Sequence, residues 1–191
     1  MNYHNITKED MNNGDGLRSV LWVAGCSHCC KECQNPQTWD PNGGIPFGVD
    51  DENELFESLN DSYISGITFS GGDPLFVKNR PEIARLIGKF REKFGDKKTI
   101  WMWTGFNWED IYTLPYIKEI DVLIDGRFEI DKRDVSLKWK GSSNQRVIDV
   151  KKTLNSDTPN IPILYCSDTK TADDEVQAQL FDAAAASCCK D

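Results

Sequence analysis

The sequence has too few basic residues to balance its acidic ones. Among its 191 residues there are 22 Lys and Arg against 31 Asp and Glu, which gives a formal net charge of −9. Proteins that bind nucleic acid in general present a basic face, and anionic membrane surfaces attract basic segments. The composition therefore argues against nucleic acid and against an anionic membrane surface as partners.

Long apolar runs and internal repeats are missing as well. No segment approaches the roughly 18 consecutive apolar residues that a membrane-spanning helix needs. Residues 1–16 are polar and acidic and lack the apolar stretch of a secretory signal. We therefore expect a cytoplasmic protein in a reducing setting, and the length predicts one folded domain with room for an appendage.

Cysteine, by contrast, is abundant. There are seven cysteines, an odd number, and four of them fall within residues 26–33. A disulfide framework would spread its cysteines and would normally belong to a secreted protein. In a reducing compartment the cluster indicates metal or redox chemistry. The spacing of Cys29, Cys166, Cys188 and Cys189 does not support a second metal site, and we expect these four to be free thiols.

Short apolar segments alternate with helical patterns along the chain. Strands are predicted at residues 20–24, 65–70, 99–104, 121–125 and 144–150. Helices are predicted at residues 50–60, 81–94 and 108–119, the last interrupted near Pro115. This order predicts an α/β fold with a mainly parallel sheet, helices outside it and ligands at the carboxyl ends of the strands. Four or five units fall short of a closed eight-unit barrel, so we expect a partial (βα) barrel with the cysteine loop after its first strand.

The pattern changes near residue 151. Residues 155–160 are rich in turn formers, residues 167–175 are polar, and residues 176–186 could form a helix. We therefore expect one domain over residues 1–150 and a C-terminal appendage over residues 151–191.

The cysteine loop offers three thiolates for iron in either of two registers. The ligand set is Cys26, Cys30 and Cys33, or Cys26, Cys29 and Cys33. Three thiolates can hold three irons of a cubane iron–sulfur cluster, whereas an electron-transfer cluster generally has four cysteine ligands. A three-cysteine site leaves one iron open for chemistry.

A structural zinc site is the non-catalytic alternative for this loop. It would use Cys26, Cys29 and Cys33, with His28 as a fourth ligand, and would make the protein a zinc-stabilised binding module. Zinc knuckles usually supply two C-x2-C pairs, and the second pair is missing here. We expect His28 to be a solvated loop residue and not a ligand.

The loop and five further motifs together resemble one enzyme family. C-x3-C-x2-C directly after the first strand resembles the signature of radical S-adenosylmethionine enzymes, and the wider set is similar to glycyl-radical activating enzymes. The motifs are NGDGLR at residues 13–18, GCSHCCKECQN at 25–35, SGGDPL at 70–75, WMWTGF at 101–106, VLIDGRF at 122–128 and WKGSSNQ at 139–145. The ordered set most resembles the subgroup that activates the anaerobic (class III) ribonucleoside-triphosphate reductase.

The resemblance implies a reaction and a set of partners. A 4Fe-4S cluster on Cys26, Cys30 and Cys33 would cleave S-adenosylmethionine reductively, and the resulting 5′-deoxyadenosyl radical would abstract a hydrogen from a glycine Cα. The partners implied are the reductase with its glycine-bearing segment, a reductant such as flavodoxin, and a second copy in a homodimer. Activation of another glycyl-radical enzyme, or a radical enzyme of deazaguanine synthesis, is the alternative within the enzyme class.

The resemblance also assigns residues to the two halves of S-adenosylmethionine. Gly71, Gly72 and Asp73 would receive the methionine amino group, because glycines let the backbone come close. Many radical enzymes have glutamate where this chain has Asp73, and the shorter carboxylate should serve if the backbone does most of the binding.

The adenine would meet the backbone of Glu32, Cys33 and Gln34 by the same resemblance. Glu32 stands where many radical enzymes have an aromatic residue, although the activating subgroup often lacks it.

Two further pairs of residues have weaker assignments. Thr104 and Asp125, at the ends of two predicted strands, would face the same pocket, although Asp125 could instead cap or turn a strand. Ser143 and Asn144 would line the mouth where the substrate glycine enters. Trp101 and Trp103 are expected to pack in the core.

Overall fold

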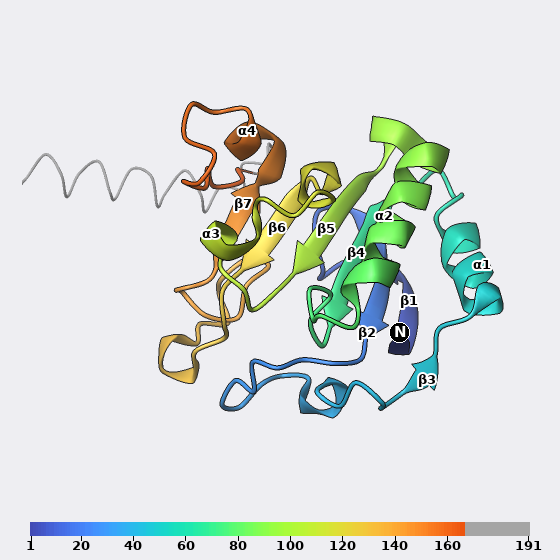
Figure 1. Cartoon of the computed structure of the whole chain (residues 1–191), viewed down its shortest axis with the longest axis horizontal. Helices are drawn as coiled ribbons and strands as arrows, with labels where there is room; N and C mark the ends of the chain where they lie inside the picture. The colour runs from blue at the N-terminus through green and yellow to red at the C-terminus, as the bar shows by residue number, and fades with distance from the viewer. Residues whose placement is uncertain (167–191) are drawn as a thin grey trace, which may run out of the picture.

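The computed structural model describes residues 1–166 and is built around one open sheet of seven strands (Figure 1). The strand order is β3-β1-β2-β4-β5-β6-β7. The strands are β1 (Asn2–Asp10), β2 (Leu17–Val23), β3 (Ile45–Pro46), β4 (Ile64–Gly71), β5 (Thr99–Trp103), β6 (Val122–Asp125) and β7 (Arg146–Asp149). The predicted α/β class is confirmed.

The sheet is mixed, which corrects the expectation of a mainly parallel one. Strands β2, β4, β5 and β6 run parallel, as predicted from their apolar segments. At the two flanks, β1 pairs antiparallel with β2 and β3, and β7 pairs antiparallel with β6. The fifth predicted strand therefore exists as β7 but runs the other way, because the segment between β6 and β7 contains only the short 3-10 helix Ile130–Lys132 and no α-helix that returns the chain to the starting edge.

Four α-helices complete the fold of residues 1–166, and two of them match the predicted helices closely. They are α1 (Val49–Ser58), α2 (Arg80–Phe94), α3 (Trp108–Ile111) and α4 (Val150–Leu154). The predicted helix 108–119 is broken: α3 ends at Ile111, Pro115 follows, and a 3-10 helix forms at Ile117–Glu119. Within residues 1–166, none of the helices has the length and apolar character that a bilayer crossing requires.

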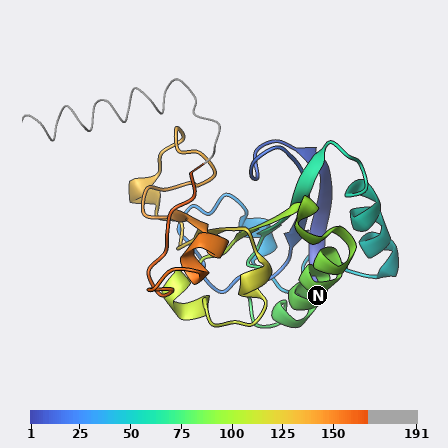
Figure 2. The same ribbon diagram turned by 90° about the horizontal axis from the view of Figure 1, so that it is seen from above.

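The two faces of the sheet have different neighbours, as β5 illustrates. Ile100 and Met102 belong to the core that includes the apolar residues of α1 and α2, whereas Trp101 packs on the other face with Trp139 and Tyr165. Figure 2 shows helices α1 (teal) and α2 (green) gathered on one side, while the loop at residues 127–142 rises on the other. In the part of the chain that the structure describes, loops and not α-helices therefore cover the second face.

Residues 151–166, which follow the predicted boundary at residue 150, return to the sheet. The amide of Tyr165 donates to the carbonyl of Val147 at 2.9 Å, and the amide of Asp149 donates to the carbonyl of Ile163 at 2.9 Å. The indole of Trp108 donates to the carbonyl of Pro159 at 2.8 Å. The predicted helix 176–186, with Cys188 and Cys189, lies outside the described residues.

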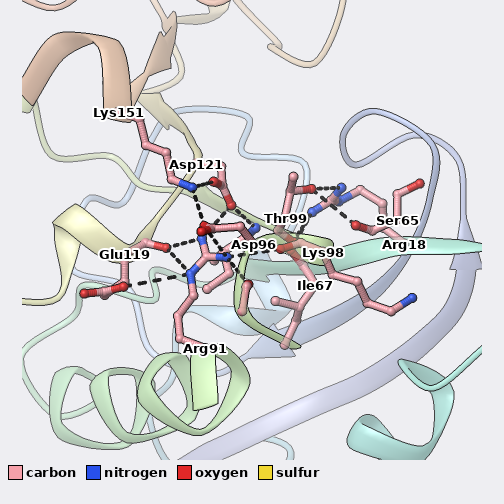
Figure 3. Close-up of polar contacts among 12 residues, drawn as sticks. Arg18, Ser65, Ile67, Arg91, Asp96, Lys98, Thr99, Glu119, Asp121 and Lys151 are labelled. Atoms are coloured by element: carbon pink, nitrogen blue, oxygen red, sulfur yellow. Dashed lines mark hydrogen bonds and ion pairs between the residues drawn. The ribbon is translucent and has the colours of Figure 1, made fainter. Parts of the chain in front are cut away.

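The edge of the sheet opposite the carboxyl ends is tied together by ion pairs. Figure 3 shows Arg91 of α2 between Glu119 and Asp121, with Lys151 of α4 reaching Asp121. The Arg91 and Lys151 nitrogens lie 2.6 and 2.9 Å from the Asp121 carboxylate. Asp121 thereby links α2, α4 and the start of β6 at this edge of the sheet.

Glu52 connects α1 to α2 and makes the stability of the protein depend on pH. It pairs with Arg85 and Lys89, and the Arg85 hydrogen bond is the largest cause that lowers the Glu52 pKa below its usual 4.5. A depressed carboxylate pKa contributes stability above the unfolded pKa, and that stability is lost as pH falls through the folded pKa. We expect Glu52→Gln to lower the free energy of unfolding by about 1 kcal/mol at pH 7, since both cations are partly exposed.

The difference between Glu52→Gln and the wild type should shrink as the pH falls below 4.5, because the unfolded wild-type chain is protonated at Glu52 first, and it should vanish once the pH is below the lowered pKa of the folded protein. Urea unfolding at pH 7 and at pH 3.5 measures it. Glu54, which pairs with Lys8 at the surface, provides the control, because exposed pairs contribute little. A loss that is equal at both pH values would contradict the ion-pair explanation.

Candidate iron–sulfur and cofactor site

A cavity of about 530 Å³ lies at the carboxyl ends of the parallel strands. Its lining includes Ser70 at the end of β4, Trp103 at the end of β5 and Gly126 just after β6. Residues 24–44, drawn in blue along the lower edge in Figure 1, follow β2 and supply the cysteines to it. The predicted position of the ligand site is therefore where a cavity occurs.

Three thiols of the cysteine loop face this cavity. Cys26, Cys30 and Cys33 belong to its lining, whereas Cys29 is exposed and does not. Cys29 has a left-handed φ of 48°, so the backbone turns sharply between the first two lining cysteines. The structure thus favours the register Cys26, Cys30 and Cys33 over the one that uses Cys29.

The loop is fixed at its base by backbone hydrogen bonds. The amides of Gly25 and Cys26 donate to the carbonyls of Thr38 and Trp39 at 2.7 and 3.0 Å. Burial raises the pKa of the Cys26 thiol to about 11 and also raises that of Cys30. Without a positive centre these thiols are stable in the neutral form, and binding of iron there would have to release their protons.

Within residues 1–166, no three His, Cys, Asp or Glu side chains are arranged as ligands of a single metal ion. A tetrahedral zinc site requires its ligands to converge on one ion, whereas in a cubane cluster each cysteine binds a separate iron. Cys26, Cys30 and Cys33 form no disulfide, they line one cavity, and they come from one short loop. This donor set fits a cluster with one iron that has no cysteine ligand.

Gly71 and Gly72 line the cavity; Gly71 packs closely against the backbone at the end of β2, and Gly72 packs against the start of the cysteine loop. A Cβ at Gly72 would lie 2.5 Å from the carbonyl oxygen of Gly25, and Gly71 has a φ of 103°. Glycine is therefore required by close approach of backbone to backbone. The backbone at this turn is at the same time exposed to the cavity, as the predicted contact with a cofactor needs.

Asp73 also lines the cavity, but its carboxylate is buried in hydrogen bonds to the protein. It is 1% exposed and accepts hydrogen bonds from the amides of Leu75 and Gly105, at 2.8 and 3.0 Å. The Thr104 hydroxyl donates to it at 2.9 Å, and His28 Nε2 lies 2.6 Å from Oδ2. Asp73 therefore holds neighbouring elements together. At this turn the backbone of Gly71 and Gly72, and not the Asp73 carboxylate, is free to contact a ligand in the cavity.

His28 is buried, which corrects the expectation of a solvated loop residue. Its side chain is 6% exposed, it packs edge-on against Phe106, and its Nε2 meets Asp73. Its other ring nitrogen, Nδ1, is buried and has no hydrogen-bond partner in the described part of the chain. Because buried polar atoms are nearly always paired, this nitrogen, on a ring that lines the cavity, fits a site built to receive a polar group.

Asp125 does not face the cavity, which corrects its predicted placement. Its carboxylate accepts hydrogen bonds from Arg146 at 3.0 and 2.5 Å and from the amide of Trp108 at 2.8 Å. Asp125 and Arg146 are directly paired across β6 and β7, and hydrogen bonding to Asp125 raises the pKa of Arg146. Asp125 therefore caps α3 and joins two strands, which is the alternative that the sequence left open.

The remaining predicted residues divide between the cavity and its surroundings. Cys33, Gln34 and Thr104 line it. Glu32, Ser143 and Asn144 do not belong to its lining; Asn144 donates instead to the carbonyl of Arg127 at 2.8 Å. Gln145, next to the predicted pair, does line it.

Several lining residues were not predicted. Trp103 was expected in the core like Trp101; Trp101 is buried, but Trp103 faces the cavity and donates to the carbonyl of Trp139 at 3.0 Å. The other lining residues that were not predicted include Asn12, Asn13, Phe128, Arg133, Trp139 and Lys140. They come from loops, where no periodicity points to a side chain's direction. Asn13, Phe128, Trp139 and Lys140 belong to the motifs described above, whereas Asn12 and Arg133 lie outside them and had no signal in the sequence.

Comparison with known proteins agrees with this geometry. Residues 12–148 match the family model described as a 4Fe-4S single cluster domain. The anaerobic ribonucleoside-triphosphate reductase-activating protein of Enterobacteria phage T4 is 44% identical over 147 residues, covering 77% of this chain and 93% of that protein. The chain belongs to this family of activating proteins.

Members of the family from several bacteria show the same level of similarity. The activating protein of Escherichia coli K12 is 42% identical over 151 residues, covering 77% of this chain and 97% of that protein. The one from Pasteurella multocida is 39% identical over 154 residues, covering 76% of this chain and 95% of that protein. The resemblance to this family that the motifs indicated is confirmed, and the match to the 4Fe-4S domain supports the predicted 4Fe-4S cluster.

Proposed function

We propose that this protein activates an anaerobic ribonucleoside-triphosphate reductase by generating a glycyl radical on it. The observation that carries the proposal is the shared cavity: three thiols on one loop face it together with the backbone of Gly71 and Gly72. The four parallel strands then correspond to a partial barrel of the radical S-adenosylmethionine type. The named activity of the relatives supports the choice of reductase.

Cys26, Cys30 and Cys33 would hold three irons of a 4Fe-4S cluster and leave the fourth iron for S-adenosylmethionine. With both bound, one electron would split the S–C5′ bond of S-adenosylmethionine into methionine and a 5′-deoxyadenosyl radical. This radical would take the hydrogen from a glycine Cα of the reductase and so give 5′-deoxyadenosine and the glycyl radical. A cellular reductant such as flavodoxin would supply the electron. The chain's own task is to position these groups and to exclude water.

The lining residues divide this task by their chemistry. The Gly71–Gly72 backbone would receive the methionine amino group, and the backbone at Cys33 and Gln34 would meet the adenine. Trp103 and Trp139, which are joined by a hydrogen bond, form an apolar wall that keeps water from the reacting atoms. The reductase's glycine-bearing segment would enter at the open side of the cavity.

Charged side chains of both signs line the cavity. The basic residues Arg133 and Lys140 line it together with Asp134, and Val135, which is also in the lining, is 85% exposed. A peptide segment that carries charged and apolar side chains would match this lining. A homodimer and a cytoplasmic setting complete the proposal.

Anaerobic reconstitution tests the proposed function. The full chain is loaded with iron and sulfide, reduced, and given S-adenosylmethionine, after which 5′-deoxyadenosine is measured by chromatography. We expect a brown protein that forms 5′-deoxyadenosine and, with the anaerobic reductase present, a glycyl radical visible by electron paramagnetic resonance (EPR). A colourless zinc protein that forms no 5′-deoxyadenosine would overturn the proposal, and 5′-deoxyadenosine without a radical on the reductase would move the activity to another glycyl-radical enzyme.

A further inference from the structure

His28 connects the cysteine loop to the loop that follows β4. It lies in the cysteine loop, two residues after Cys26 and two before Cys30, and its Nε2 is 2.6 Å from Asp73 Oδ2 on the loop after β4. An ionised carboxylate can only accept, so the imidazole is the donor in this bond. One ring thus joins the predicted cluster ligands to the predicted methionine site.

The end of β5 is shaped to receive the same ring. A Cβ at Gly105 would lie 2.4 Å from Cδ2 and 2.7 Å from Nε2 of His28, closer than any side chain could approach. Phe106 also packs edge-on against the His28 ring, with the two ring centroids 4.7 Å apart at an interplanar angle of 77°. Gly105 is therefore needed here because the imidazole lies flat against its backbone.

Asp73 connects His28 to the strand ends. The same carboxylate accepts from the Thr104 hydroxyl and from the amide of Gly105, so that β4, β5 and the cysteine loop meet at one buried group. The segment of the cysteine loop between Cys26 and Cys30 contacts this carboxylate through the ring of His28.

We propose that His28 is a positioning residue that holds the cysteine loop against the carboxyl ends of β4 and β5, through Asp73 and the bare backbone of Gly105. It fixes the distance between the thiols of Cys26 and Cys30 and the turn at Gly71–Gly72. The part of this inference that concerns S-adenosylmethionine depends on the proposed function, whereas the fastening of the loop does not.

The fastening is tested first on the protein without a cluster. Anaerobic pulse alkylation of the full chain, read by mass spectrometry, reports how often the loop opens to expose the half-buried Cys26, with exposed Cys166 as internal reference. We expect His28→Ala to raise the alkylation rate of Cys26 at least tenfold without changing that of Cys166. His28→Gln, whose amide N–H can still reach Asp73, should return the rate to within threefold of the wild type.

Gly105→Ala tests the same contact from the other side. Its Cβ would displace the ring, so Cys26 should become as reactive as in His28→Ala, and combining the two changes should add nothing. Lys31→Ala, an exposed change in the same loop, is the matched control and should leave the rate unchanged. An unchanged Cys26 rate in His28→Ala, or a Gln variant no better than Ala, would overturn the proposal.

The consequence for the cofactor is tested on the reconstituted protein. The EPR spectrum of the reduced cluster is titrated with S-adenosylmethionine, and we expect the half-saturating concentration to rise at least tenfold in His28→Ala and to recover in His28→Gln. An unchanged half-saturating concentration would overturn the role in cofactor positioning. If the wild type itself shows no spectral change and forms no 5′-deoxyadenosine, the proposed function fails, while the alkylation result still decides whether His28 fastens the loop.

Discussion

Cys30→Ala should abolish assembly of the 4Fe-4S cluster, whereas Cys29→Ala should leave it intact. Cys30 lines the cavity with Cys26 and Cys33, while its neighbour Cys29 is exposed on the outer side of a left-handed turn. A cluster held by only three cysteines has no spare protein ligand, so the loss of one leaves two irons unsupported. We expect iron and sulfide per chain to fall to background in Cys30→Ala and to remain at the wild-type level in Cys29→Ala.

The measurement is iron and sulfide content after anaerobic reconstitution, together with visible absorbance and the EPR spectrum after reduction. Cys29→Ala is the matched control, since it removes a thiol from the adjacent position in the same loop. Unfolding in urea before reconstitution checks that both variants are equally folded. The opposite pattern, with Cys29 essential and Cys30 dispensable, would show that the ligands are Cys26, Cys29 and Cys33.

The central strands could be predicted from the sequence because each is a short apolar segment buried on both faces. Strand β4, for example, has an unbroken run of five buried residues from Gly66 to Ser70. Strand β1 could not be predicted in this way. It lies toward the edge of the sheet, only Tyr3 among its nine residues is buried, and its polar side chains resemble a loop. Pairing with β2, which no local pattern encodes, makes it a strand.

The site was predictable where the backbone or a reactive atom is required and unpredictable where a distant partner decides. The cysteine cluster stands out by its spacing, although the spacing alone leaves two registers open, and the Gly71–Gly72 turn is marked only together with the other motifs. The direction of Asp125 depends on Arg146, which an antiparallel strand brings beside it, and the burial of His28 depends on Asp73, 45 residues away in sequence. Local sequence patterns place neither pair, because the fold alone brings the two members of each pair together.

Arg18→Ala should cost the most stability of any single substitution considered for this protein, about 3–5 kcal/mol. Arg18 is fully buried in β2, and its guanidinium donates all five of its N–H groups. They go to the Thr68 and Thr99 hydroxyls and to the carbonyls of Asp15, Ile67 and Thr99, at 2.8 to 3.1 Å. Figure 3 shows the side chain reaching Thr99 across the strands.

The large expected cost has two physical sources. Removal of the guanidinium leaves buried carbonyls and hydroxyls of β4 and β5 without donors, and it opens a cavity beside Trp101, whose ring lies 5.3 Å from the cation. Burial lowers the pKa of Arg18 to about 9, so the group is still charged at neutral pH and its hydrogen bonds are charge-assisted. Lysine has three donors from one point and cannot span three strands, so Arg18→Lys should be only a partial replacement.

The effect of Arg18 should extend to the cavity. The Thr68 hydroxyl that accepts from Arg18 Nε also donates to the carbonyl of Asn13 at 2.7 Å, and Asn13 is part of the cavity lining. Urea unfolding of Arg18→Ala and Arg18→Lys, with the exposed Arg127→Ala as control, measures the stability; the control should change it by less than about 0.5 kcal/mol. If Arg18→Ala unfolds at the same urea concentration as Arg127→Ala, then β2, β4 and β5 are held together without this guanidinium.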